Sequence, residues 1–160
     1  MKVLPEYIKA GFPTDKKIKA DYSKMARMCR EALASHPEDK DYLLAWEVVY
    51  LCSDKQYEAS LKAGREVLPV LTLQDCIDDI ERNELWCLEQ LGRTPEAIDI
   101  LKKKAAATKE GNERYSVYGS IRELYKKLND RENMLRYGSM MLEESPDQMD
   151  VEELREQAEL

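Results

Sequence analysis

The amino-acid sequence predicts an all-α protein, a solenoid of about three to four antiparallel helix hairpins closed by a C-terminal capping helix. Apolar residues recur in steps of three and four through most of the 160 residues. Glycine and proline, the residues that interrupt helices, number only six each. The expected hairpin turns at Asp54, Gly92 and Asn129 are 38 and 37 residues apart, which is the spacing of a helical repeat. Stacked hairpins of this kind share one continuous core.

The clearest hairpin spans residues 85–104. An apolar stripe leads to Gly92, and Thr94 and Pro95 are residue types preferred at a helix N-cap and first position. The stripe then resumes, and its members are Leu85, Leu88, Leu91, Ala97, Ile98 and Leu101.

The N-terminal third predicts a lead-in followed by two long helices. Residues 1–14 are expected to be irregular because prolines and a glycine interrupt them, and Thr14 or Asp15 is expected to cap the first helix. Asp39 or Asp41 is expected to cap the second helix. That helix is apolar nearly all round, which indicates a central helix or one lining a groove.

The remaining hairpin helices continue to residue 146. A third helix is expected after the turn at Asp54, stopping near Pro69, and a fourth from Thr72. A sixth and a seventh helix are expected on either side of Asn129. Residues 147–160 predict an acidic helix with a narrow apolar face, suited to cap the array. All of this is expected to form a single domain.

Cysteine and histidine usage argues against several kinds of chemistry. The four cysteines form no C-x-x-C pair and fall within helical stretches, which favours reduced core residues over a redox or metal role. His36 is the only histidine and is expected in a solvated turn. We therefore expect no metal site, no cofactor and no enzymatic activity, because no phosphate loop, nucleophile motif or carboxylate constellation is found.

Charge is concentrated at the two ends of the chain. Residues 143–160 hold eight acidic residues and one arginine, whereas residues 1–30 hold eight basic and three acidic residues. These ends are expected to be solvated helix faces or, alternatively, to mediate head-to-tail contact or steer a charged partner. No stretch reaches the length of a membrane span or resembles a signal peptide, so a cytoplasmic location is expected. Nucleic-acid binding is not expected, and the oligomeric state is left open.

Several residues resemble the tetratricopeptide-repeat family over about residues 15–146. The bulky pattern of that family's first helix is similar to Leu43, Trp46 and Tyr50, and to Tyr118, Ile121 and Tyr125. The alanine of its second helix corresponds to Ala59 and Ala97, with Met134 in the third copy. Its closing pattern is approached by residues 32–37 and 141–146.

The resemblance implies a right-handed solenoid whose concave face binds a protein or an extended peptide. It places eight residues on that face, namely Leu44, Val48, Arg82, Asn83, Trp86, Glu89, Glu123 and Lys127. Trp86 is the strongest candidate because it lies off the apolar stripe, and its alternative is packing against the next repeat. Arg82 and Asn83 are expected to take a carboxylate or a backbone amide.

The expected function is that of a binding scaffold. One form is the sensor or interaction domain of a larger bacterial regulator. The alternative is a small chaperone or adaptor for a secreted or assembled partner.

Overall fold

The computed structural model describes residues 4–14 and 19–144, and the regular structure within them is entirely helical. Tertiary contacts divide the chain into two compact units, with the boundary between Arg93 and Thr94. The sequence predicted a single domain, and the boundary falls inside the hairpin predicted at residues 85–104. Each unit is therefore described by itself.

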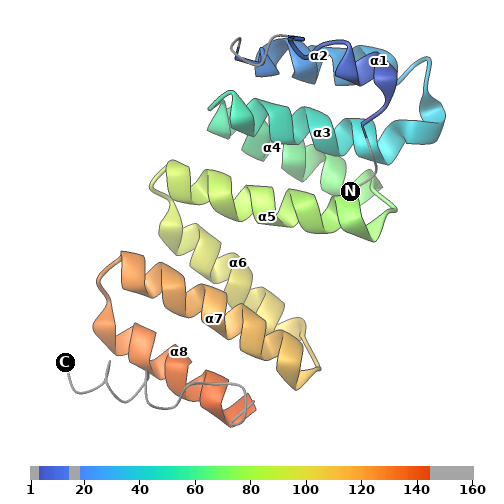
Figure 1. The fold of residues 1–160 in the computed structure, drawn as a ribbon. Coiled ribbons are helices and arrows are strands. Elements are labelled where there is room, and N and C mark those ends of the chain that lie inside the picture. Colours follow the sequence, from blue (N-terminus) through green and yellow to red (C-terminus); the bar gives the residue numbers. More distant parts are fainter. Residues whose placement is uncertain (1–3, 15–18, 145–160) are drawn as a thin grey trace. The chain divides into compact units, whose positions relative to one another are not determined.

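Unit 1 contains five α-helices within the described residues (Figure 1). Helix α2 packs on α3, α3 packs on both α4 and α5, and α4 packs on α5. Two short 3₁₀ turns, Pro37–Asp39 and Leu68–Val70, precede α3 and follow α4. The helix bounds are α1 Glu6–Lys9, α2 Tyr22–Ala32, α3 Lys40–Ser53, α4 Tyr57–Val67 and α5 Gln74–Gln90.

Helix α3 lies at the centre of unit 1, which is one of the two alternatives that its nearly uniform apolar composition left open. Trp46 is 2% exposed and belongs to a cluster formed with buried residues of α1 and α2. Val48 is fully buried in a second cluster, together with Cys76 and Ile80 of α5. The side chains of α3 therefore join two cores that lie against different neighbours.

The N-terminal lead-in is more ordered than the sequence predicted. Residues Glu6–Lys9 form one helical turn, and Ile8 is completely buried in the cluster around Trp46. The Tyr7 ring stacks on the His36 ring at a centroid distance of 3.9 Å, and the Tyr7 hydroxyl donates to Asp39 at 2.7 Å. His36 lies in the connection between α2 and α3, as expected, but the Tyr7 ring covers part of it and leaves it half-buried.

Two of the expected N-caps, Thr14 and Asp41, do not cap the helices assigned to them. Helix α2 begins at Tyr22 with Asp21 as its cap, accepting from the Lys24 N–H at 2.8 Å, so Thr14 does not cap it. Asp15 lies outside the described residues. The Asp39 side chain makes no capping bond to α3.

Asp41 connects α3 to the start of α5 instead of capping its own helix. One of its carboxylate oxygens accepts from the Thr72 N–H at 2.6 Å, the Leu73 N–H at 2.8 Å and the Thr72 hydroxyl at 2.9 Å. Burial acts to raise the pKa of Asp41, but these hydrogen bonds outweigh it and hold the pKa below its usual range. The ionised carboxylate therefore stabilises the entry into α5.

Unit 2 contains α6 Thr94–Ala107, α7 Gly111–Lys127 and α8 Arg131–Glu144. Helix α7 packs against both α6 and α8. The Tyr137 ring lies 5.9 Å from the Tyr118 ring and 5.7 Å from the Tyr125 ring, measured between centroids. These tyrosines therefore contribute to the packing between α7 and α8.

Arg114, near the start of α7, is bonded to Glu144 at the end of α8, and so connects the two helices at the end of the hairpin opposite the turn. Its guanidinium donates from Nε and Nη2 to the two oxygens of Glu144, at 2.7 and 2.8 Å. Its Nη1 donates to the Thr108 and Lys109 carbonyls at the end of α6. One side chain thus joins parts of all three helices of unit 2.

Helices α3, α5 and α7 end with the same backbone geometry. A left-handed residue follows each helix, at Lys55 (φ 63°), Gly92 (φ 71°) and Asn129 (φ 55°). In each case its N–H donates to the carbonyl three residues earlier, and the next N–H donates to the carbonyl five residues earlier. This pair of hydrogen bonds provides partners for carbonyls at the helix end that would otherwise have none.

The left-handed residues are 37 residues apart in both intervals. The sequence placed the first turn at Asp54, but the left-handed position is Lys55. The same one-residue shift applies to α4, the second helix of the α3–α4 hairpin, where Ala59 was the expected small residue. Ala59 is exposed, and Ser60, which lies 37 residues before the buried Ala97, is the residue at the close contact.

The predicted capping helix at residues 147–160 lies outside the described residues.

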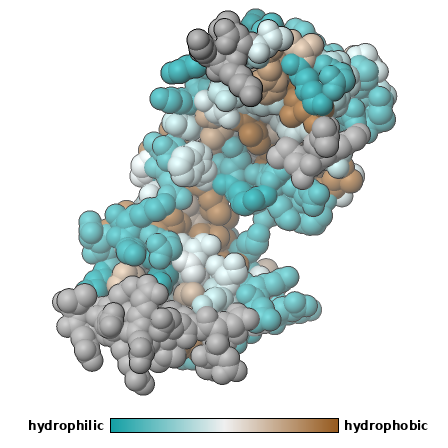
Figure 2. All heavy atoms as spheres, viewed as in Figure 1, coloured by the Kyte–Doolittle hydropathy of each residue, from teal (hydrophilic) through white to brown (hydrophobic). Residues whose placement is uncertain are grey.

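On the face of unit 1 seen in Figure 2, hydrophilic residues are interspersed with smaller hydrophobic patches.

Candidate functional site

Trp86 is the most exposed of the large apolar side chains described. It is 51% exposed on α5, whereas the other tryptophan, Trp46, is 2% exposed. An aromatic ring of this size left half in water is a common anchor for a partner.

A single stripe along α5 carries Trp86. Asp75, Asp79, Arg82 and Gln90 occur at steps of three and four around it, and therefore share its side of the helix. The other side of α5 carries Cys76, Ile80, Cys87 and Leu88, all buried. Because α5 is held by that apolar side against α3 and α4, the orientation of the Trp86 stripe is determined by packing.

Asn83 serves the packing between α4 and α5. Its amide donates to the Ser60 hydroxyl at 2.9 Å and to the Cys87 sulfur at 3.6 Å. The fully buried Ser60 hydroxyl in turn donates to the Val48 carbonyl at 2.8 Å. Asn83 is therefore engaged in a chain of hydrogen bonds that runs from α5 through α4 to α3.

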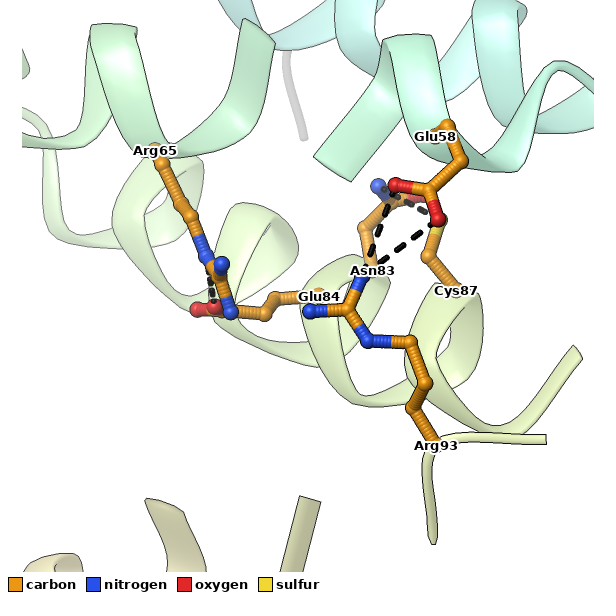
Figure 3. Close-up of polar contacts among 6 residues, drawn as sticks. All are labelled: Glu58, Arg65, Asn83, Glu84, Cys87 and Arg93. Carbon is orange, nitrogen blue, oxygen red and sulfur yellow. Dashed lines mark hydrogen bonds and ion pairs between the residues drawn. The ribbon is translucent and has the colours of Figure 1, made fainter. Parts of the chain in front are cut away.

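Two ion pairs flank this chain of bonds (Figure 3). Arg65 of α4 donates to Glu84 of α5 at 2.7 Å. Arg93, just after α5, lies 3.4 Å from Glu58 at the start of α4. The two ends of the α4–α5 contact are thus joined by opposite charges.

Arg82 also has partners within α5. Its guanidinium forms an ion pair with Asp79 and donates to the Asp78 carbonyl at 3.3 Å. The side chain remains exposed, but its charge is already matched by a carboxylate one turn away. The carboxylate-binding role expected for Arg82 and Asn83 would therefore compete with internal bonds of both residues.

The remaining expected site residues occupy different environments. Val48 is completely buried, so in this structure it is not accessible to a partner. Leu44 is half-buried beside the cluster that contains Val48, and Glu89 is half-buried on α5. Glu123 and Lys127 are exposed on α7. They belong to unit 2, whereas the residues of α5 belong to unit 1.

Val48 was wrongly expected on an exposed face. On a helix that is apolar nearly all round, the sequence does not indicate which side faces a groove. Of the acidic residues on the Trp86 side of α5, Glu89 was expected in the site, whereas Asp75 and Asp79 were missed. Their signal was available in the spacing of Asp75 and Asp79 relative to Trp86.

The four cysteines are buried and form no disulfide. Burial raises the pKa of Cys29 to about 12 and that of Cys76 to about 11. Burial, with the neighbouring Cys87 thiol as a further cause, raises the pKa of Cys52 to about 12. These groups are therefore protonated at neutral pH, which makes them poor nucleophiles.

Among residues 4–14 and 19–144, no group of three or more histidine, cysteine, aspartate or glutamate side chains is arranged to hold a metal ion. None of the helices in that part of the chain combines the length and apolar character needed to cross a bilayer.

Comparison of the chain with protein-family models, curated proteins and solved structures found no match.

Proposed function

We propose that this protein is an interaction module that binds a partner protein or peptide through the Trp86 face of α5. We define this face by its exposed or half-buried residues Asp75, Asp78, Asp79, Arg82, Trp86 and Glu89. The observation that carries the proposal is the half-exposed indole on a helix whose opposite side is packed into the core of unit 1. A rigidly held aromatic surface loses little conformational entropy when a partner covers it.

We further propose that the hairpins are tetratricopeptide-like repeats of a right-handed solenoid. The recurrence of one helix-ending geometry at Lys55, Gly92 and Asn129 supports a repeat of 37 residues. In such a repeat, α3, α5 and α7 are equivalent first helices. A sensor domain of a larger regulator and a small chaperone or adaptor would both use such a surface, and the identity of the partner distinguishes them.

The test is affinity capture from the native cell extract with three baits. The unsubstituted chain, Trp86→Ala and Val70→Ala are compared, with retained proteins identified by mass spectrometry. Val70 is a matched control because it is 49% exposed but lies in the connection between α4 and α5. We expect a partner that Val70→Ala retains and Trp86→Ala loses, with capture reduced about tenfold or more.

Thermal unfolding of the same variants separates binding from folding. Trp86→Ala is expected to change the free energy of unfolding by less than about 1 kcal/mol, because exposed side chains contribute little to stability. A large loss of stability, or full retention of the partner by Trp86→Ala, would contradict the proposal.

A further inference from the structure

The Trp86 face has a net negative charge. Asp75, Asp78, Asp79 and Glu89 carry carboxylates, and Arg82 carries the only positive charge among the residues that define the face. Asp79 and Arg82 form an ion pair, and Asp75 and Asp78 add negative charge beside it. Potentials of this kind select the charge of a partner and accelerate its association.

The internal bonds of α5 argue against a carboxylate as the ligand. Arg82 is paired with Asp79, and the Asn83 amide is engaged with Ser60 and Cys87. The two donors that could bind an anionic group therefore already have partners, while Glu89 follows Trp86 by one turn and Asp75, Asp78 and Asp79 lie in the first turns of the same helix.

We propose that the Trp86 face binds a cationic segment of another protein, rich in lysine and arginine, with one cation lying over the indole ring. The inference rests on the proposed function and adds the chemistry of the partner. Tryptophan is the aromatic residue that attracts cations most strongly through its negative ring face. Neighbouring carboxylates add attraction of the same sign, and they also disfavour acidic partners and nucleic acid.

Titration of the purified chain with synthetic peptides tests the charge preference. A peptide rich in lysine and arginine is compared with a peptide of equal length that carries glutamate instead. Binding is measured by calorimetry on the unsubstituted chain. It is also followed by fluorescence on Trp46→Phe, which leaves Trp86 as the only tryptophan. We expect the basic peptide to bind and to change Trp86 emission, and the acidic peptide to do neither.

Substitutions of opposite charge should have opposite effects. Asp78→Asn should weaken binding of the basic peptide, by about threefold, because it removes an attractive charge. Arg82→Gln should strengthen binding to a similar extent, because it removes the repulsive charge and releases Asp79 from its ion pair. Glu31→Gln is the matched control, since Glu31 is an exposed acid on α2, and it should leave the affinity unchanged.

Salt provides a second measure. Raising the ionic strength from about 0.05 to 0.5 M should weaken binding by about tenfold, because the Debye length falls from about 14 to about 4 Å and exposed charges are screened. The inference is overturned if the acidic peptide binds better, if neither peptide binds, or if Arg82→Gln weakens the basic peptide.

The two proposals fail in different ways. A partner lost by Trp86→Ala but unaffected by salt and by Asp78→Asn would overturn the cationic partner and leave the interaction module in place. A self-associating chain in sedimentation, with association lost in Trp86→Ala, would identify a second copy as the occupant and overturn the cationic partner.

Discussion

The α3–α4 hairpin of unit 1 and the α7–α8 hairpin of unit 2 turn through the same backbone geometry, at Lys55 and Asn129. They are stabilised differently. Helix α3 is buried on several sides and carries acidic groups that bind other elements, with Asp41 joined to Thr72 and Leu73, and Glu47 paired with Arg30. Helix α7 relies on tyrosine contacts and on the Arg114–Glu144 pair at the open end.

The difference shows that a shared turn does not determine how a hairpin is held. The turn depends on local hydrogen bonds within about six residues. The bonds that hold the hairpin depend on what lies beside it. We expect substitutions at the turns to have similar effects in both hairpins, and substitutions at the lateral contacts to differ.

Truncation of Trp46 should have the largest effect. Trp46→Ala removes a ring that is 2% exposed from the cluster joining α3 to α1 and α2, and should lower the free energy of unfolding by about 3–5 kcal/mol. Denaturant unfolding measures this loss. Trp86→Ala is the control, because it removes the same side chain from an exposed position. Equal losses in the two variants would contradict the central placement of α3.

Removal of the Asp41 carboxylate should come next. Asp41→Ala leaves the Thr72 and Leu73 N–H groups without their acceptor and should cost about 1.5–3 kcal/mol. The folded-state pKa of Asp41 lies below its unfolded value, so this stabilisation is present above that unfolded pKa and is lost as the pH falls through the folded value. Thermal unfolding between about pH 7 and 2 should therefore show a smaller acid-dependent loss in Asp41→Ala than in the unsubstituted chain.

The Arg114 pair should have a smaller and more local effect. Arg114→Met should increase amide hydrogen exchange in the last turn of α8 and at the start of α7, because the bidentate contact with Glu144 is lost. The melting temperature should fall less than in Asp41→Ala, since the pair lies near solvent and is screened by salt. Exchange that rises equally in α3 would show that the two units unfold together.

The turns should show the smallest effects and the closest similarity. Lys55→Gly and Asn129→Gly should each stabilise the protein, by about 0.4–1 kcal/mol for Lys55, because glycine adopts a positive φ without strain. The gain at Asn129 should be smaller, since asparagine tolerates this conformation better than lysine. Gly92→Ala should destabilise by about 1 kcal/mol through its φ of 71° alone, because a β-carbon there would meet nothing within 4 Å. Chemical denaturation of the three variants measures these differences.

Much of the fold could be predicted because helices and turns are local. The central burial of α3, the end of α4 near Pro69 and the turns around Gly92 and Asn129 follow from apolar spacing and from residue types at helix ends. The shift from Asp54 to Lys55 was missed because lysine has no preference for the left-handed region. The helix α1 was missed because its stability comes from burial of Ile8, which a four-residue segment cannot reveal.

The site was less predictable than the fold. Trp86 could be selected because it lies off the apolar stripe of α5, and its exposure is as expected. Asn83 and Val48 could not be assigned, since both were chosen by position in a repeat pattern while their surroundings depend on α4 and α5. The binding roles of Trp86 and of the other α5 residues stay predictions until a partner is measured.

The sequence by itself determined that this chain is helical and in what order its described helices occur, because backbone hydrogen bonds in a helix join residues four apart and apolar spacing reports one face. Only the tertiary structure decided which hydrogen-bond partners the buried polar residues have. Asp41 binds N–H groups 31 and 32 residues away, and Ser60 joins Val48 to Asn83. Such pairings depend on which helices lie side by side, and that arrangement arises from the packing of the whole unit.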